Sequence, residues 1–134
     1  SRSTNSPQRV KEMVLLVISS SGTSLPWTSQ QLDALRLAVS QSIDHILPAS
    51  EGSNTLVHRV EVRRRKRQHR LEVHLRANNP RHRDTVVARL DPRGECGSLV
   101  QELLQRCFAV AGGRACSLQI EECFVAHETP RQGI

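Results

Sequence analysis

The longest unbroken apolar run of the chain is Met13–Ile18, and it stops at a series of serines. A short segment of Val, Leu and Ile without polar alternation is typical of a strand that is buried on both faces. We therefore predict a strand at the centre of a sheet. If helices cover only one face of that sheet, this strand presents an apolar strip on the other face. The candidate interface residues on the strip are Met13, Leu15, Leu16 and Val17.

Apolar residues recur every three or four positions between Leu32 and Ile46, which is the period of an amphipathic helix. Thr28 and Gln31 fit a capping box, in which each side chain satisfies a free backbone N–H at the helix start. Pro48 follows the last apolar position, and proline cannot continue a helix. The sequence thus predicts a helix that begins at Thr28 and ends before Pro48.

A second helix is predicted to begin at Ser98, because Ser98 and Gln101 repeat the capping-box spacing. Its apolar stripe is expected to contain Leu99, Leu103, Cys107 and Val110, with Val100, Leu104 and Ala111 alongside. Glycines at 112 and 113 favour an end there, because glycine tolerates the left-handed conformation of a helix C-terminus.

Residues Leu56–Arg63 and His69–Ala77 alternate between apolar and polar side chains, the pattern of strands with one buried face. The loop Arg64–Gln68 between them is almost entirely cationic. We therefore predict a β-hairpin with a basic end. Its inward side chains are Val60, Val62, Leu71, Val73 and Leu75. Its opposite face is expected to carry Arg59, Glu61, Arg63, Arg70, Glu72, His74 and Arg76.

The last predicted strand is Cys116–Ala126, with Leu118 and Ile120 directed inward. Its neighbours Glu121 and Glu122 are expected to point to opposite faces, which excludes them as a paired acid and base on one substrate. The segment Thr85–Leu90 is either a further short strand or an extended connection.

The resulting order is strand, helix, two hairpin strands, helix, strand. This βαββαβ order predicts an α+β fold, a ferredoxin-like sandwich with an antiparallel sheet and two helices on one face. Right-handed crossovers place the first and third strands in the middle of the sheet. The length of 134 residues suits one domain. We expect that domain over residues 11–127, a disordered segment over 1–10 and a tail over 128–134.

Positive charge is concentrated in one part of the chain. Between Arg59 and Arg93 there are twelve Lys and Arg residues and four acids, whereas the remainder has seven and nine. Such an asymmetry predicts a positive field on one side of the fold. The aromatic fraction is only 2%, with no tyrosine.

The sequence contains no motif of an enzyme, a metal site or a membrane protein. It has no Gly-rich phosphate loop, GxSxG or HExxH motif, and no apolar run long enough to span a membrane. The four cysteines lack the CxxC spacing of zinc sites, and we expect them to be buried, reduced thiols. We therefore predict a non-enzymatic protein without a cofactor or metal, located inside the cell, in the nucleus or cytoplasm.

The basic hairpin has an evident physical use as a binding site for a polyanion. Arginine presents a planar fork that bonds two oxygen atoms, so phosphate groups of a nucleic acid fit it well. The hairpin strands contain no aromatic residue that could stack on bases, which favours contact with the nucleic-acid backbone. The candidate polyanion-binding residues are Arg59, Arg63, Arg64, Arg65, Lys66, Arg67, Arg70 and Arg76.

Other interpretations are open at this point. The charged hairpin end can simply be solvated, act as a weak nuclear localisation signal, or bind an acidic protein surface. The alternative function is a protein-interaction or dimerisation domain of a larger scaffold, acting through the open sheet face, with a homodimer as one form. The apolar strip is expected either to form such an interface or to be covered by the segment 81–90 or by the residues from His127.

Overall fold

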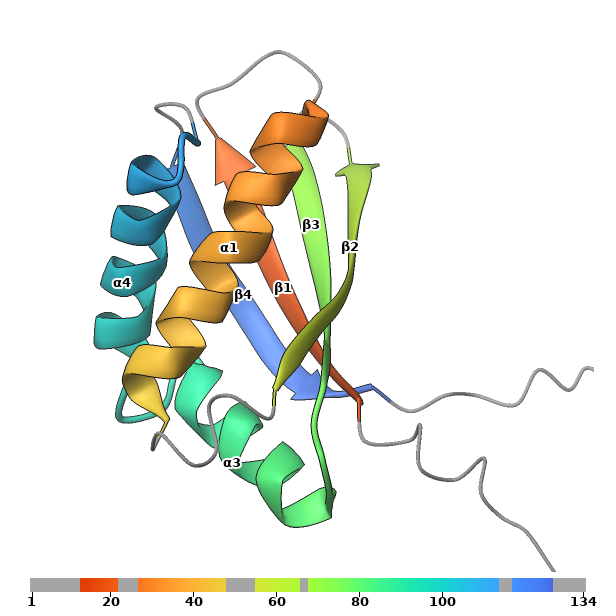
Figure 1. The fold of residues 1–134 in the computed structure, drawn as a ribbon, viewed down its shortest axis with the longest axis vertical. Coiled ribbons are helices and arrows are strands. Elements are labelled where there is room, and N and C mark those ends of the chain that lie inside the picture. Colours follow the sequence, from red (N-terminus) through yellow and green to blue (C-terminus); the bar gives the residue numbers. More distant parts are fainter. Residues whose placement is uncertain (1–12, 22–26, 48–54, 66–67, 114–116, 127–134) are drawn as a thin grey trace, which may run out of the picture.

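The computed structural model describes residues 13–21, 27–47, 55–65, 68–113 and 117–126, with the backbone alone described at 56, 64, 65, 68 and 69. Within these ranges the chain has an α+β structure with a four-stranded antiparallel sheet and three helices (Figure 1). The segments 1–10 and 128–134, predicted as a disordered N-terminus and a tail, lie outside the described residues.

The strands are β1 Met13–Ser21, β2 Leu56–Arg65, β3 Gln68–Arg76 and β4 Ser117–Val125. Their order in the sheet is β2-β3-β1-β4, and every neighbouring pair is antiparallel. The first and third strands therefore occupy the middle, as predicted. This order places the basic hairpin β2–β3 at one side of the sheet and β4 at the other.

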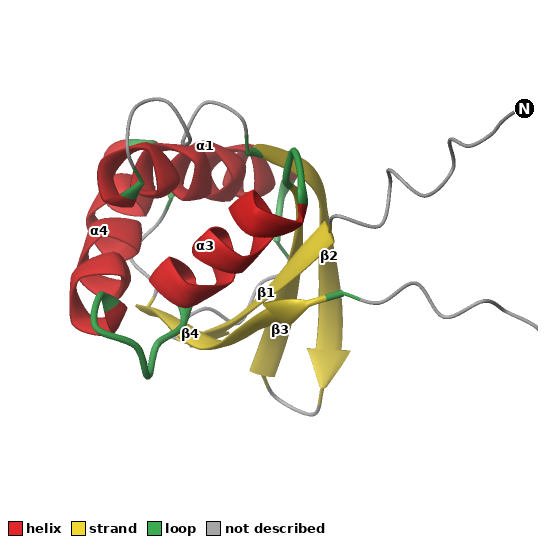
Figure 2. Cartoon of the chain, turned by 90° about the horizontal axis from the view of Figure 1, so that it is seen from below, coloured by secondary structure: helices red, strands yellow, loops and turns green. Residues whose placement is uncertain are grey.

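The helices are α1 Ser29–Ile46, α3 Pro80–Leu90 and α4 Gly97–Val110. They lie on the same side of the sheet, which is evident when the molecule is seen from below (Figure 2). One core cluster forms between the two layers, with side chains from all three helices and from β1, β3 and β4. The opposite sheet face carries none of the three helices, and we call it the open face.

The beginning of α1 confirms the predicted capping box. Gln31 N donates to Thr28 Oγ1 at 3.2 Å, and Thr28 N donates to Gln31 Oε1 at 3.0 Å. These two bonds satisfy backbone donors that the first helical turn leaves free. The predicted stripe is also confirmed, because Leu35, Val39, Ile43 and Ile46 are buried.

The segment Thr85–Leu90 is helical, so its prediction as a strand or extended connection was wrong. It belongs to α3, which Asn79 caps by accepting from His82 N at 2.8 Å and which has Pro80 in its first turn. Buried side chains at His82, Val86 and Leu90 follow a spacing of four residues. Since Val86 and Leu90 join the core between helices and sheet, this segment does not cover the open face.

The beginning of α4 also differs from its prediction. The helix starts at Gly97 with Cys96 as N-cap, and no side chain caps it. The Gln101 side chain instead donates to Leu118 O at 2.5 Å and accepts from Ile120 N at 2.8 Å, while Gln105 Oε1 accepts from Leu118 N at 2.8 Å. These contacts occupy the outer edge of the first half of β4, which would otherwise be free to pair with another strand.

The residues of α4 that pack against the core are shifted by one position along the sequence from the predicted apolar stripe. Val100, Leu104 and Phe108 are buried, whereas Leu99 is 51% and Val110 is 81% exposed. This helix has two adjacent stripes of apolar residues, and the sequence pattern alone did not show which of the two faces the core.

A β-bulge in β4 changes where two acidic side chains lie. The pairing with β1 shifts between Val17 and Ile18, so that Glu121 is the extra residue between Ile120 and Glu122. Ile120 and Cys123 are both buried on the helix side, and Glu121 and Glu122 are both exposed between them. Glu121 accepts a 2.6 Å hydrogen bond from Ser19 Oγ, and Glu122 is paired with Val17. Both carboxylates therefore lie on the open face, contrary to the prediction that they point to opposite faces.

Candidate nucleic-acid interface

The charged residues of the hairpin form a two-column ladder on the open face. Three pairs of residues stand directly opposite each other: Arg59 and His74, Glu61 and Glu72, and Arg63 and Arg70. Successive pairs are two residues apart along each strand, so their side chains share one face. The predicted common face of these six residues is thus confirmed.

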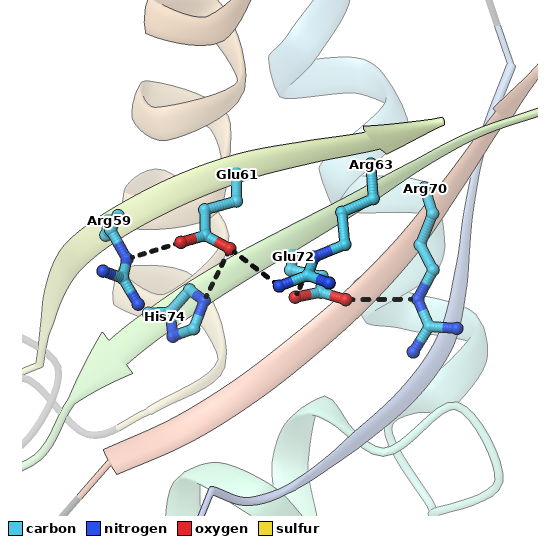
Figure 3. A network of polar contacts seen from close by, with 6 residues as sticks. All are labelled: Arg59, Glu61, Arg63, Arg70, Glu72 and His74. Atoms are coloured by element: carbon cyan, nitrogen blue, oxygen red, sulfur yellow. Dashed lines mark ion pairs between the residues drawn. The ribbon is translucent and has the colours of Figure 1, made fainter. Parts of the chain in front are cut away.

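Ion pairs connect the ladder across and along the strands (Figure 3). Arg59 Nε lies 3.1 Å from Glu61 Oε2, and Arg70 Nε lies 3.5 Å from Glu72 Oε2. Arg63 joins both carboxylates, with Nη2 3.5 Å from Glu61 Oε1 and Nε 3.3 Å from Glu72 Oε1. Two carboxylates placed directly opposite each other repel, and the guanidinium of Arg63 offsets this repulsion.

The cluster of Arg59, Arg63, Arg70, Glu61 and Glu72 retains positive charge, because it contains three guanidinium groups and two carboxylates. The side chains of Arg59 and Arg63 are 56% and 65% exposed, whereas that of Glu72 is only 12% exposed. The Glu72 carboxylate therefore lies below the guanidinium groups of Arg59 and Arg63, which reach into solvent, while Glu61 and Arg70 are each 32% exposed. An anion that approaches this face meets arginine first.

His74 lies within the same cluster and is largely uncharged at neutral pH. Burial lowers the pKa of its imidazole below the ordinary value of 6.5, and the positive charge of Arg59 lowers it further. Glu61 and Glu72 act in the opposite direction, and His58 adds a smaller lowering contribution. The Nε2 atom is 3.9 Å from Glu61 Oε1, a contact that becomes an ion pair only when His74 is protonated.

We expect the stability of the domain to fall as the pH decreases from about 6.5, in part because of His74. At pH values between the lowered pKa of His74 in the folded chain and 6.5, the unfolded chain binds more protons than the folded chain does. Protonation of His74 therefore favours unfolding. The His74→Gln variant should lose this part of the pH dependence, measured by urea unfolding at a series of pH values. His45→Gln, at an exposed position of α1, is the matched control. If the free energy of unfolding of His74→Gln depends on pH as steeply as that of the unmodified protein, His74 is not a source of the pH dependence.

Three side chains of the ladder could in geometry hold a metal ion. One ligand atom each from Glu61, Glu72 and His74 lies within 4.8 Å of the others. The arginines already contact both carboxylates, however, and a divalent cation would add positive charge beside them. The charges of this cluster therefore favour an anionic partner over a metal ion.

The other candidate polyanion-binding residues lie toward the two ends of the hairpin. Arg76 is exposed at the end of β3, opposite Met13 of β1. Arg64 and Arg65 belong to β2, which is longer than predicted and is paired as far as Gln68. Lys66 and Arg67 lie outside the described residues. The predicted loop Arg64–Gln68 is thus reduced to a two-residue connection.

The candidate interface residues of β1 separate into two groups. Leu16 is 1% exposed and lies in the core, so it is not available on the open face. Met13, Leu15 and Val17 alternate with it and lie on the open face, where Val17 is only 2% exposed. A strand that is apolar on both sides gave no sign of which residues face the helices.

Sequence reasoning did not identify Phe124 as a residue of the open face. Phe124 is paired with Leu15 of β1 and is 38% exposed. Alternation along β4 would have placed it inward with Leu118 and Ile120, but the bulge at Glu121 reverses the alternation. Together, Phe124 and Leu15 form an apolar patch on the open face, in which Leu15 lies next to His74 of β3 and Phe124 lies on the same edge strand as Glu121 and Glu122.

The described cysteines are free thiols. Cys96 and Cys107 are partly buried and Cys123 is buried, while Cys116 lies outside the described residues. Burial, and to a smaller extent the negative charge of Asp91, raises the pKa of the Cys123 thiol to about 12. Cys123 therefore stays protonated and acts as a small core residue.

Comparisons with known proteins do not assign the chain to a family. No family model matches it, and neither a curated protein nor a solved structure shows a match. None of the helices in the described part of the chain is long and apolar enough to cross a membrane. The function of the chain is therefore inferred from its own residues.

Proposed function

We propose that this chain is a non-enzymatic binding module whose β2–β3 hairpin contacts the phosphate backbone of a nucleic acid. The observation that carries the proposal is the ladder on the open face, where Arg59, Arg63 and Arg70 surround only two carboxylates. The sequence continues with Arg64 and Arg65, whose backbone belongs to the paired end of β2. Basic residues thus follow one another along the hairpin.

Backbone contact suits this surface better than base recognition does. Guanidinium groups on a strand can each bond phosphate oxygens, and binding then depends strongly on salt but little on sequence. Glu61 and Glu72 hold Arg59, Arg63 and Arg70 in place, which lowers the entropy lost on binding. The hairpin strands have no aromatic side chain for base stacking.

The same proposal includes the fold type and the place of action. The antiparallel order β2-β3-β1-β4, with α1 and α4 on one face, supports a ferredoxin-like βαββαβ arrangement in which α3 is an additional helix. The free thiols at Cys96, Cys107 and Cys123 support an intracellular location, in the nucleus or cytoplasm.

A polar hollow beside β4 supports the non-enzymatic assignment. It has a volume of about 520 Å³ and is lined by residues of β1, β4 and the start of α4, including several serines, Gln101 and Glu121. Its described lining residues include no histidine, lysine or cysteine. The Ser19 hydroxyl there donates to the Glu121 carboxylate, and no described lining residue places an imidazole or amine beside a serine, so a nucleophile activated by histidine or lysine is not supported.

Replacing Arg64, Arg65 and Arg67 by glutamate is expected to abolish binding to generic RNA and duplex DNA without unfolding the domain. In the unmodified protein, affinity should fall steeply with salt, and each lost phosphate contact should reduce the salt slope by about 0.9 on duplex DNA. Fluorescence anisotropy with labelled RNA and DNA over a salt series measures both effects.

The matched control replaces Arg36, Arg93 and Arg106 by glutamate, which makes the same charge change at exposed positions of α1, the turn before α4, and α4. This control should bind nearly as well as the unmodified protein. Retained binding in the hairpin variant, or an equal loss in the control, would contradict the proposal.

A second candidate function is a protein-interaction or dimerisation domain that uses the open face. The specific observation in its favour is Phe124, which is 38% exposed beside Leu15 on the open face. An exposed apolar patch bordered by charged residues is typical of a protein interface. An acidic protein surface or a second copy would suit the basic hairpin.

A further inference from the structure

The two sides of the open face carry opposite charges. On the side of β2 and β3, the arginines Arg59, Arg63, Arg70 and Arg76 outnumber the carboxylates Glu61 and Glu72 by two. On the side of β4, the bulge presents the two carboxylates Glu121 and Glu122. The excess of two positive charges on one side thus equals the two negative charges on the other, and β1 with Leu15 and Val17 lies between the two sides.

From this distribution we infer that the open face binds a second copy of the same chain, with β2 of each copy opposite β4 of its partner. A two-fold axis parallel to the strands, between two stacked sheets, produces this arrangement. Each basic side then faces an acidic side in net charge, twice per dimer, with Arg63 near the level of the Glu121 bulge and Glu61 at the level of Glu122. An axis across the strands would instead place β2 on β2 and β4 on β4, with like charges facing each other. Charge complementarity therefore selects the first arrangement.

The size of the face is sufficient for a specific dimer. Four strands of nine or ten residues cover about 20 Å by about 30 Å. Burying that face on both copies removes about 1,200 Å² of surface in total, the lower end of the range for stable protein interfaces. Leu15 on β1 and Phe124 on the edge strand β4 supply exposed apolar surface on it.

Pairing through the first half of the β4 edge is disfavoured. Gln101 and Gln105 of α4 already bond the outward backbone groups of Leu118 and Ile120. A strand from another molecule would have to displace these side chains before it could extend the sheet there. Stacking of two open faces leaves all of these bonds intact.

The dimer rests on the second candidate function, and it buries the arginines of the ladder, so a second copy and a nucleic acid compete for the open face. It is tested by light scattering and sedimentation equilibrium of the purified chain over a wide range of concentrations, without nucleic acid. Failure of this test leaves the polyanion proposal standing, and the anisotropy experiment tests that proposal separately.

Two charge-reversal variants test the proposed contacts. Each is expected to associate weakly with itself, and the two are expected to associate with each other. The acidic-side variant is Glu121→Lys with Glu122→Lys, and the basic-side variant is Arg59→Glu with Arg63→Glu. Each alone places like charges opposite each other and should raise the dimer dissociation constant by roughly a hundredfold. An equimolar mixture restores opposite charges at both contacts and should form a heterodimer about as strong as the original dimer.

The control is Asp33→Lys with Asp44→Lys, which changes the charge equally at exposed positions of α1 and should leave association unchanged. Heterodimer formation by the mixture also shows that both variants fold. A chain that stays monomeric at high concentration overturns the proposal. So does a dimer that is indifferent to the charge reversals, or a mixture that does not associate.

Discussion

Replacing Phe108 by alanine is expected to lower the free energy of unfolding by about 3–5 kcal/mol, the usual loss for a fully buried aromatic residue. Phe108 is completely buried on the core side of α4. Its ring contacts that of Trp27, with centroids 5.5 Å apart and planes inclined by 37°. Because a domain of this size has a total stability of about 5–15 kcal/mol, a substantial part of it depends on this one side chain.

The structure around Phe108 offers little room for relaxation, which sets the expected loss at the upper end of that range. The ring packs so closely on Gly113 that a Cβ there would stand 2.4 Å from it. A cavity left by the missing ring is therefore bordered by backbone on one side, and backbone collapses less readily than side chains do.

Urea unfolding measures this loss, and two variants provide the comparison. Phe108→Leu, which keeps part of the volume, should lose less than Phe108→Ala. Leu99→Ala changes an exposed residue of the same helix, 51% exposed, and should alter stability by no more than about 0.5 kcal/mol. Equal losses in Phe108→Ala and Leu99→Ala would contradict the assigned core.

The elements that the sequence predicted well are those whose signals are local. The capping box of Thr28 and Gln31 involves residues three positions apart, and the helix begins there. The alternation in the hairpin likewise placed Leu71, Val73 and Leu75 in the core. Such patterns depend on the helix and strand periods, which follow from backbone geometry over a few residues.

The helix α3 shows how a local signal can be misread. Its start had a good signature, because Asn79 is a favoured N-cap and Pro80 suits the first turn. The β-branched residues of Thr85–Leu90 nevertheless suggested an extended segment. The spacing of His82, Val86 and Leu90 would have corrected the prediction, since residues four apart share one helix face.

Other features depend on contacts between distant parts of the chain and could not be read from the sequence. Gln101 bonds Leu118 and Ile120, which are 17 and 19 positions away, so its predicted role in a capping box was wrong. The bulge that brings Glu121 to the open face arises from the pairing of β4 with β1. The acidic side of the proposed dimer interface is a consequence of this pairing.

Replacing Gly97 by alanine is expected to destabilise the domain by about 3 kcal/mol or more, although alanine is the better helix former by about 1 kcal/mol. Gly97 is the first residue of α4. A Cβ at this position would stand 2.1 Å from the carbonyl oxygen of Pro92 and 2.7 Å from its carbonyl carbon. Both are backbone atoms, so no side-chain rotation relieves the overlap and the start of α4 must move.

Gly112→Ala is the comparison, because Gly112 is a glycine with φ +97° and no neighbouring atom within 4 Å of an added Cβ. Its loss should come from backbone conformation alone, at about 1–2 kcal/mol. Urea unfolding of both variants should therefore show the larger loss for Gly97→Ala. A Gly97→Ala variant as stable as the unmodified protein would contradict the close contact with Pro92.

The same variant tests whether the position of α4 protects the edge of β4. If the start of α4 moves, Gln101 moves with it and its bonds to Leu118 and Ile120 lengthen. Hydrogen exchange at the Ile120 amide should then become faster in Gly97→Ala than in Gly112→Ala, beyond what their difference in global stability explains. A free strand edge also invites pairing with another chain, so Gly97→Ala should aggregate more readily than Gly112→Ala. Unchanged protection of Ile120 would show that Gln101 holds the edge independently of how α4 begins.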